Sequence, residues 1–409
     1  MRINPERFLS RLEELSRIGR AESGGVTRLA FTPEDRAAND LVRKWMKEAG
    51  LAVRMDPAGN TFGRLDGTEG GAVVLTGSHL DTVREGGRYD GAAGVIAALE
   101  TLTVLSENSV RPRRPVEMAV FRGEEGSRFP GGLMGSLTLT GKLPDDYPDR
   151  VRDGAGVSLA EAMTAFGANP AEFAAARYGE PIKAFLELHI EQAGVLEDAG
   201  RPVGIVTGIA GPHMLRLTLR GRSGHAGAMP MTGRRDPIVA AGQIIQAVEK
   251  TALAAGPTTR GTVGYIKAYP GGTNVIASEV EMTMDYRDID VTARQKAVTA
   301  IKAEIAAVCR KRGIDYSLKT TTDVLPTPVD GEILARLRKC ARREGIDALE
   351  LPSGAGHDAM VMASVGPMGM IFIRSRDGLS HCSEEYSSPE DLVLGTQLLL
   401  AAVTELTND

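Results

Sequence analysis

Three apolar runs in the first half of the chain have the length and composition of buried β-strands. They cover residues 72–78, 115–122 and 184–190, and the apolar stretch at 91–107 is long enough for a helix. Uninterrupted apolar runs are typical of strands that helices cover on both faces of a sheet. We therefore expect a sheet flanked by helices in this part of the chain.

The pattern of side chains changes near residue 208. Residues 214–220 and 279–287 alternate apolar and polar positions, and helical patterns follow at 236–255 and 291–312. Alternation with a period of two is typical of an antiparallel sheet with one buried face. This region therefore predicts a small α+β domain in which two helices cover one face of the sheet.

These two patterns predict an α/β protein with two domains. The larger domain, a mixed sheet flanked by helices, is expected from residues 1–208 and 325–409, and the smaller α+β domain is inserted between them at 209–324. A length of 409 residues suits two domains. Closure over a ligand would place hinges near 208–212 and 322–328.

Composition excludes several classes of function. The formal net charge is −5 and aromatic residues make up 4% of the chain, so neither a basic surface nor stacking platforms for nucleic acid are expected. No apolar run reaches the roughly 18 residues of a membrane span, and no signal pattern opens the chain. Three cysteines without CxxC spacing suit a reducing compartment, so we expect a cytoplasmic protein.

Histidines and carboxylates follow the predicted strands. His79 and His189 stand at two strand ends, Asp90 precedes the predicted helix, and His381 lies near the C-terminus. Ligands of open α/β sheets gather beyond the carboxyl ends of the strands. Carboxylates are costly to bury there unless they are paired or bind a metal. The sequence therefore predicts one crevice that holds these side chains.

Imidazole and carboxylate ligands without cysteine favour Zn, Mn, Co or Ni in a catalytic rather than a structural site. A hydrolase with two divalent ions needs a bridging carboxylate, terminal ligands on each ion and a free base. In our interpretation Asp90 is the bridge, His79 and His189 bind one ion, and Glu125 and His381 bind the other.

The catalytic base is predicted from the pair Glu124 and Glu125. Adjacent residues of an extended segment point in opposite directions, so both should not bind the same ion. Glu124 therefore remains as the general base. Asp81 lies two residues from His79 and is expected to assist catalysis by accepting its second ring N–H.

Seven motifs occur in this order: TGSHLDTVREGGRYDGAAGV, EEGSRFP, ELHIEQ, GHAGAMPMTGRRDP, PGGTNVI, SGAGHDAM and GLSHCSEEYS. Together they resemble the amidase/hydantoinase/carbamoylase branch of the aminoacylase-like dinuclear metallohydrolases, over about residues 20 to 400. The resemblance implies a homodimer through the inserted domain and supports the metal roles given above. One departure is Ala193 before Gly194, where ELHIEQ is usually followed directly by glycine.

The resemblance also implies substrate contacts for Gln192, His225, Asn274 and Arg287. The forked guanidinium of Arg287 suits a substrate carboxylate. In the family, the histidine at the position of His225 reaches the partner subunit's site and stabilises the oxyanion of the tetrahedral intermediate. The glycine-rich loop at Gly356 offers backbone donors at close approach.

The predicted reaction is hydrolysis of the ureido C–N bond of an N-carbamoyl-L-amino acid, a small anionic substrate, to the L-amino acid, CO2 and ammonia. Allantoate and β-ureidopropionate require the same metal chemistry and remain alternatives. The segment IAG continues with Pro212 and His213, where allantoate enzymes tend to carry Gln-Arg. His213 is interpreted as structural or as the edge of the substrate pocket. His357 and Asp358 are left out of the metal set, with a structural hydrogen-bonded pair as one interpretation.

Two remoter functions are weighed against the same residues. Aminoacylases and dipeptidases of the wider superfamily commonly carry an acidic ligand at the position of His189, which points away from them. A binding protein that has lost its metals is opposed by the complete set of candidate ligands.

Overall fold

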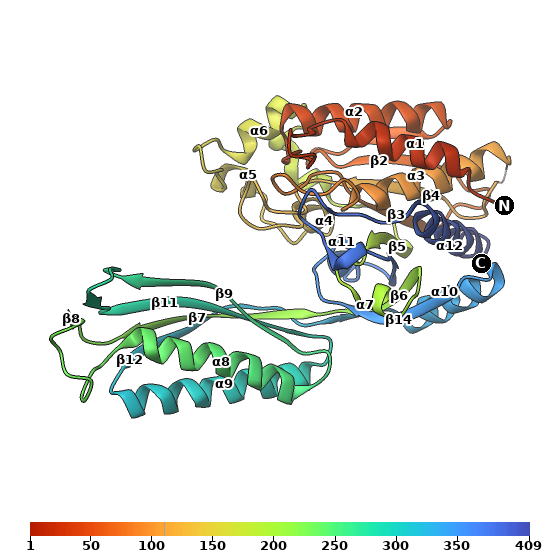
Figure 1. Ribbon diagram of the computed structural model, residues 1–409. Coiled ribbons are helices and arrows are strands. Elements are labelled where there is room, and N and C mark those ends of the chain that lie inside the picture. Colours follow the sequence, from red (N-terminus) through yellow and green to blue (C-terminus); the bar gives the residue numbers. More distant parts are fainter. Residues whose placement is uncertain (110) are drawn as a thin grey trace. The chain divides into compact units, whose positions relative to one another are not determined.

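The computed structural model describes residues 1–109 and 111–409, and these form two compact units (Figure 1). Unit 1 consists of Met1–Thr207, Val329–Leu351 and His357–Asp409. Unit 2 consists of Gly208–Pro328 and Pro352–Gly356.

The short segment Pro352–Gly356 differs from the expected organisation, which placed it in the larger domain. Its backbone bonds to unit 2 instead. The Ser353 carbonyl accepts the Ala210 N–H at 2.8 Å, and the Gly354 carbonyl accepts Nη1 of Arg287 at 3.0 Å. Contacts of this kind, made by backbone carbonyls of a loop, leave no trace in the side-chain pattern.

A mixed sheet forms the centre of unit 1. In spatial order its strands are β1 (Ala52–Met55), β2 (Thr61–Leu65), β4 (Val116–Phe121), β3 (Val73–His79), β5 (Ile182–Ile190), β15 (Met368–Ile373), β6 (Val203–Ile209) and β13 (Thr327–Pro328), and β14 (Ala348–Ser353) pairs with β6. By residue number, β13 and the ends of β6 and β14 belong to unit 2. Strands β4, β3, β5 and β15 run parallel to one another.

The helices of unit 1 pack on this sheet or on one another. They are α1 (Pro5–Ser16), α2 (Pro33–Glu48), α3 (Ala92–Glu107), α4 (Met134–Leu139), α5 (Tyr147–Arg150), α6 (Leu159–Phe166), α7 (Val195–Asp198), α10 (Gly331–Glu344), α11 (Asp358–Met362) and α12 (Pro389–Thr407), with 3-10 turns η1 (Pro170–Ala176) and η2 (Arg376–Gly378). Helix α3 is buried along nearly its whole length and packs on β3, β4 and β5. The three apolar runs and the apolar helix of the sequence are thus confirmed to within two residues.

Parallel pairing puts the carboxyl ends of β3, β4 and β5 at one edge of the sheet. Each of these strands is buried over the residues that precede this edge. Polar side chains that follow the three strands are therefore brought together, although more than 100 residues separate the first from the last along the chain.

Unit 2 is an antiparallel sheet with two long helices on one face (Figure 1). Its strands lie in the order β12 (Asp315–Asp323), β7 (Gly211–Arg220), β11 (Glu279–Asp288) and β9 (Arg260–Tyr269); a separate pair is β8 (Gly224–His225) with β10 (Val275–Ile276). The helices are α8 (Pro237–Ala255) and α9 (Val291–Arg312). Along β11 every second side chain is buried, because alternate residues face these helices.

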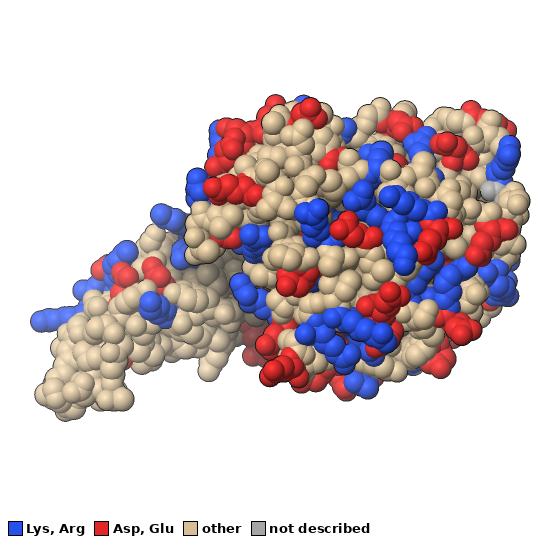
Figure 2. All heavy atoms as spheres, turned by 90° about the horizontal axis from the view of Figure 1, so that it is seen from above, with Lys and Arg blue, Asp and Glu red and all other residues tan. Residues whose placement is uncertain are grey.

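Acidic and basic groups are interspersed on the molecular face in Figure 2. Charged residues also form ion pairs between elements, such as Lys339 of α10 with Glu405 of α12 and Arg338 of α10 with Glu350 of β14. Among the described residues, none of the helices has the length and apolarity that crossing a membrane requires.

Candidate metal centre

Asp90 lies in the middle of a cluster at the carboxyl edge of the unit 1 sheet. His79 is the last residue of β3, His189 is next to last in β5, and Asp90 precedes α3. Gly91, which separates Asp90 from the helix, has φ +62°, and a Cβ there would lie 2.4 Å from Cε1 of His79. Only glycine allows the Asp90 loop to approach the His79 ring this closely.

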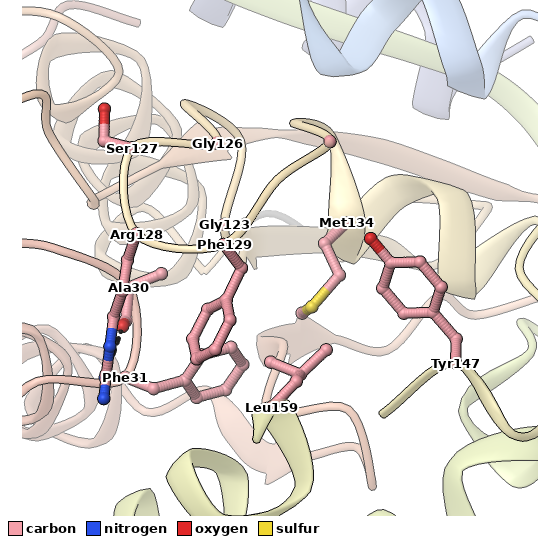
Figure 3. Close-up of a pocket in the computed structure, with 11 residues that line it drawn as sticks. Ala30, Phe31, Gly123, Gly126, Ser127, Arg128, Phe129, Met134, Tyr147 and Leu159 are labelled. Carbon is pink, nitrogen blue, oxygen red and sulfur yellow. Dashed lines mark hydrogen bonds between the residues drawn. The ribbon is translucent and has the colours of Figure 1, made fainter. Parts of the chain in front are cut away.

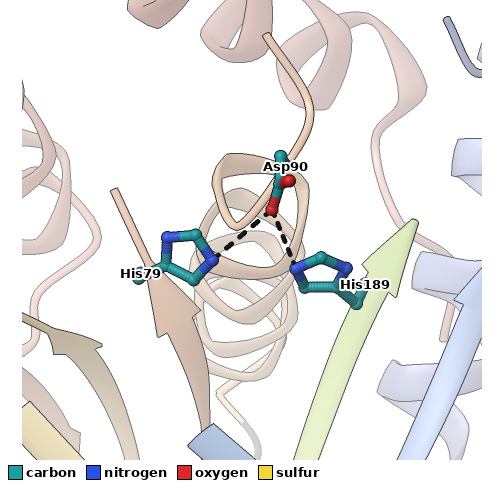
Figure 4. Close-up of side chains that lie close together, drawn as sticks. All are labelled: His79, Asp90 and His189. Carbon is teal, nitrogen blue, oxygen red and sulfur yellow. Dashed lines mark ion pairs between the residues drawn. The ribbon is translucent and has the colours of Figure 1, made fainter. Parts of the chain in front are cut away.

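The first group of candidate ligands is His79, Asp90 and His189, all of them buried. Oδ1 of Asp90 lies 3.5 Å from Nε2 of His79 and 3.1 Å from Nε2 of His189 (Figure 4). The ligand atoms all lie within 4.8 Å of one another, so one ion could reach all three.

The second group is Asp90, Glu125 and His381. Nε2 of His381 lies 3.1 Å from Oδ2 of Asp90 and 3.5 Å from Oε2 of Glu125. Asp90 therefore offers one oxygen to each group. The His381 side chain is 50% exposed whereas that of Glu125 is 6% exposed, so this group opens to solvent on the histidine side.

Glu124 is in neither group. Its Oε2 lies 3.7 Å from Nε2 of His79, and the side chain is 11% exposed. Burial raises the pKa of Glu124 well above its usual value, although the nearby His79 ring works in the opposite direction. A carboxyl group that is close to the candidate ligands and holds a proton readily has the properties of a general acid or base.

The electrostatics of the cluster centre on Asp90. Burial works against its charge, but hydrogen bonds from His189, His381 and His79 hold the pKa of Asp90 well below the usual value. In return, the hydrogen bond to Asp90 raises the pKa of His381 to about 9. Burial raises the pKa of Glu125 to about 7. The buried carboxylates thus need positive charge nearby, from ring protons or from cations.

Asp81 differs from its expected arrangement. Its backbone carbonyl, rather than its carboxylate, lies 2.9 Å from Nδ1 of His79, whereas Oδ1 is 4.0 Å away. The carboxylate instead accepts the backbone N–H of Glu124 at Oδ1 (3.3 Å) and that of Glu125 at Oδ2 (3.2 Å). Asp81 therefore contacts the segment that carries the candidate base.

Gln192 reaches the same cluster from the segment after β5. Its Nε2 donates to Oδ2 of Asp90 at 2.8 Å and lies 3.4 Å from Nε2 of His381. Gln192 and His381 both have φ +59°, a left-handed conformation that is uncommon outside glycine. Backbone strain of this kind concentrates at functional sites, where surrounding contacts hold it in place.

The other predicted substrate contacts belong to unit 2. His225 of β8 pairs with Val275 of β10, and the Asn274 carbonyl accepts the Ala226 N–H at 2.9 Å. Thus His225 and Asn274 are neighbours within this unit.

Arg287 of β11 forms an ion pair with Asp285 and donates to the Gly354 carbonyl. Gly354 is in the same short segment as Gly356. Arg287 and the glycine-rich loop are therefore linked by a direct contact.

Two histidines left out of the predicted metal set make buried contacts. The His357 ring packs against His189 with centroids 4.4 Å apart, behind the first ligand group. Nδ1 of His213 in β7 lies 3.2 Å from Oδ1 of Asp323 in β12. Asp358 has its Oδ1 bonded to the Ser136 hydroxyl at 2.6 Å.

A small apolar pocket lies next to the loop that carries Glu124 and Glu125 (Figure 3). Phe31, Phe129, Met134 and Leu159 line it and belong to one hydrophobic cluster. None of the candidate metal ligands is among its lining residues. The pocket is therefore separate from the ligand groups.

Sequence reasoning missed Ser380 and Glu385. Oγ of Ser380 lies 3.1 Å from Oδ2 of Asp90 and 2.8 Å from Oε2 of Glu385. Glu385 is 4% exposed, whereas the neighbouring Glu384 is exposed. Glu384 stands in a turn that the Glu385 N–H closes on the Cys382 carbonyl, so no periodic pattern in the sequence indicates which of the two glutamates is buried.

Comparison with known proteins identifies the family of this chain. Residues 75–405 match the peptidase family M20/M25/M40. The chain is 44% identical to an N-carbamoyl-L-amino acid amidohydrolase of Geobacillus stearothermophilus over 99% of both chains. It is 39% identical to an allantoate amidohydrolase of Bacillus subtilis, over 95% of this chain and 94% of that one.

Among solved structures, an amidase of the hydantoinase/carbamoylase family from Burkholderia multivorans matches with a TM-score of 0.94 and 33% identity, over 100% of this chain and 99% of that one. The sequence resemblance to the hydantoinase/carbamoylase branch is thereby confirmed. The chain belongs to peptidase family M20/M25/M40, a family of metal-dependent hydrolases.

Proposed function

We propose that this protein hydrolyses the ureido C–N bond of N-carbamoyl-L-amino acids with the help of two divalent metal ions. The observation that carries the proposal is the sharing of Asp90 by two candidate ligand groups, with Glu124 close to His79 of the first group and part of neither. The full-length similarity to an N-carbamoyl-L-amino acid amidohydrolase supports the choice of reaction.

The residues present fit a pair of ions. Oε1 of Glu125 is buried and has no hydrogen-bond partner among the described residues, and Asp90 needs neighbouring positive charge. His79, Asp90 and His189 would hold one ion, and Asp90, Glu125 and His381 the other. Nitrogen and carboxylate donors suit Zn, Mn, Co or Ni. Bound ions would supply Lewis acidity for the attacking water and the ureido carbonyl.

Glu124 would act as the general base and then as the general acid. Its carboxylate would take a proton from the water that attacks the ureido carbonyl and return it to the leaving nitrogen. The C–N bond to the amino acid breaks, and the released carbamate decomposes to CO2 and ammonia. Glu124 lies 3.7 Å from His79 and outside both ligand groups, so its carboxylate is not needed to bind an ion in either step.

Substrate binding is proposed for Gln192, His225, Asn274, Arg287 and the backbone at Gly356. Nε of Arg287 donates a hydrogen bond to Asp285, and Nη1 donates one to the Gly354 carbonyl. A substrate carboxylate would compete with these partners and gain a two-pronged, charge-assisted contact. His225 would stabilise the oxyanion, a role in which one lost donor typically costs about 3–4 kcal/mol.

A homodimer through unit 2 is part of the proposal. Strand β9 is at the edge of its sheet, and its exposed side chains include Tyr265 (43%) and Ile266 (49%). Leu253 of α8, a helix that contacts β9, is 76% exposed. An exposed apolar edge strand is a template for pairing with a second copy. Sedimentation should show a dimer, which Ile266→Lys should weaken.

A shared site can be tested with two variants that each keep only residual activity, His225→Ala and Glu124→Gln. If His225 serves the partner subunit, a mixed dimer has one complete site. Random exchange should then restore about a quarter of wild-type activity, because half of the dimers are mixed and each has one working site of two. Absence of any rescue in verified mixed dimers would contradict the shared site.

Allantoate is the second candidate substrate, favoured by the similarity to an allantoate amidohydrolase. The deciding experiment measures ammonia and amino-acid release by protein loaded with Mn, Co, Ni or Zn. The panel contains N-carbamoyl-L- and D-amino acids, allantoate, β-ureidopropionate, N-acetyl amino acids and dipeptides. Chelator-sensitive release from carbamoyl-L-amino acids alone would support the proposal.

Other outcomes discriminate among the alternatives. A preference for allantoate would keep the mechanism and replace the substrate. Cleavage of only dipeptides or acetyl amino acids would overturn the assigned reaction, and metal binding without turnover of any panel member would favour a binding protein.

A further inference from the structure

A buried carboxylate outside both ligand groups joins the two loops that carry them. Glu385 lies between η2 and α12 and is 4% exposed. Its Oε1 accepts the backbone N–H of Tyr89 at 2.8 Å and that of Asp90 at 3.1 Å. Its Oε2 accepts the hydroxyl of Ser380 at 2.8 Å. Both oxygens are therefore committed to loops that are almost 300 residues apart in sequence.

The loop before Asp90 is shaped around this carboxylate. A Cβ at Gly87 would lie 1.9 Å from Cδ of Glu385, so no other residue fits at that position without displacing the glutamate. Such tight packing, together with two backbone amides on one oxygen, holds the Asp90 backbone in one place. The same side chain holds Ser380, whose neighbour His381 is a candidate ligand of the second group.

The direction of the Ser380 proton also matters. Its Oγ lies near both Oε2 of Glu385 (2.8 Å) and Oδ2 of Asp90 (3.1 Å), and a serine hydroxyl has one proton to donate. The shorter contact directs that proton to Glu385. Oδ2 of Asp90 then keeps a lone pair that a donated hydrogen bond would otherwise occupy.

We infer that Glu385 is a positioning residue for the metal centre, which fixes the Asp90 backbone and draws the Ser380 proton away from the shared carboxylate. The inference rests on the proposed metal roles of Asp90 and His381, but it does not depend on the identity of the substrate. Outer partners that orient ligands in this way typically change metal affinity or activity about 10- to 100-fold when they are removed.

Three variants of the full-length protein test the inference. Glu385→Ala removes every contact. Glu385→Gln keeps an acceptor for the two amides but presents an NH2 group to Ser380, which must then turn its proton toward Asp90. Glu384→Gln is the matched control, because Glu384 is exposed and its side chain bonds to its own neighbours Ser383 and Cys382.

The readout is metal binding itself, measured by titration of the metal-free protein with Co²⁺ or Zn²⁺ and by bound-metal content after dialysis. We expect Glu385→Gln and Glu385→Ala to weaken binding of at least one ion about 10- to 100-fold, with the control unchanged. Adding Ser380→Ala to Glu385→Gln removes the misdirected proton and should recover most of the lost affinity.

Wild-type metal affinity in both Glu385 variants would overturn the inference. So would a Glu385→Gln variant that keeps its affinity while Glu385→Ala unfolds, because Glu385 would then serve only the fold. No recovery in the double variant would overturn the part assigned to the Ser380 proton. Failure of the proposed function is distinguishable, because it would appear as absent turnover by wild-type protein that binds its metals normally.

Discussion

Replacing Asp81 by asparagine separates two roles for this residue. If the carboxylate fixes the tautomer of His79, Asp81→Asn should weaken metal binding about 10- to 100-fold. In the structure the backbone carbonyl of Asp81 contacts the His79 ring, and asparagine keeps that carbonyl. The carboxylate contacts the amides of Glu124 and Glu125. We therefore expect normal metal content and a lower kcat.

The size of the effect follows from the two amide contacts. The asparagine side chain has one acceptor oxygen, so its NH2 group would face one of the two backbone N–H groups, and one charge-assisted hydrogen bond is lost. Such a bond contributes about 1.5–3 kcal/mol. The observed lengths of 3.2 and 3.3 Å are long for N–H···O bonds, which favours the lower value. If the loss falls on the transition state, kcat should drop about tenfold.

The assay compares kcat, metal content and melting temperature of Asp81→Asn with wild type and with Asp66→Asn, a control at a side chain that is 80% exposed. A double variant with Glu124→Gln isolates the route of the effect. If Asp81 acts by positioning Glu124, the double variant should lose no more activity than Glu124→Gln alone. Additive losses, or reduced metal content with unchanged kcat at full loading, would refute this reasoning.

Three further outcomes are expected. Burial and the neighbouring Glu187 raise the pKa of Asp358 from 3.8 to about 8. The unfolded chain therefore loses this proton before the folded metal-free protein does, and the folded protein loses stability as pH rises from 4 to 8. In melting scans, the melting temperature of Asp358→Asn relative to wild type should rise through that window and stay constant above it. Asp35→Ala leaves the Arg122 charge buried and unpaired, and should cost about 3–5 kcal/mol in denaturant unfolding. Arg287→Lys should raise KM for carboxylate substrates, with little change for a matched neutral amide.

The parts of the fold that could be predicted are long apolar runs or segments with a clear alternation of apolar and polar residues. Strands β3, β4 and β5 are uninterrupted apolar runs, and β7 and β11 alternate with a period of two. The region from α4 to η1 was not predicted, because its elements are too short to show a period. The strands β1 and β2 were not predicted for the same reason.

The candidate site divides in a similar way. Residues with metal-binding side chains at strand ends, such as His79 and His189, could be found from chemistry and position alone. The arrangement of Asp81 could not, because its partners are backbone amides, which every residue except proline offers. Glu385 was not predicted, because the backbone N–H groups that it accepts from, at Tyr89 and Asp90, lie almost 300 residues away and only the fold brings them together.

If the proposed roles hold, the division of these residues between the two units predicts that the metal site does not select among ureido substrates. The five candidate ligands and Glu124 all belong to unit 1, as does Gln192, whereas His225, Asn274, Arg287 and Gly356 belong to unit 2. Under the proposed roles, unit 1 carries the bond-breaking chemistry that carbamoyl amino acids, allantoate and β-ureidopropionate share. Differences among these substrates concern the group beyond the ureido carbon. Changes of substrate preference should therefore arise from substitutions in unit 2 that leave metal binding intact.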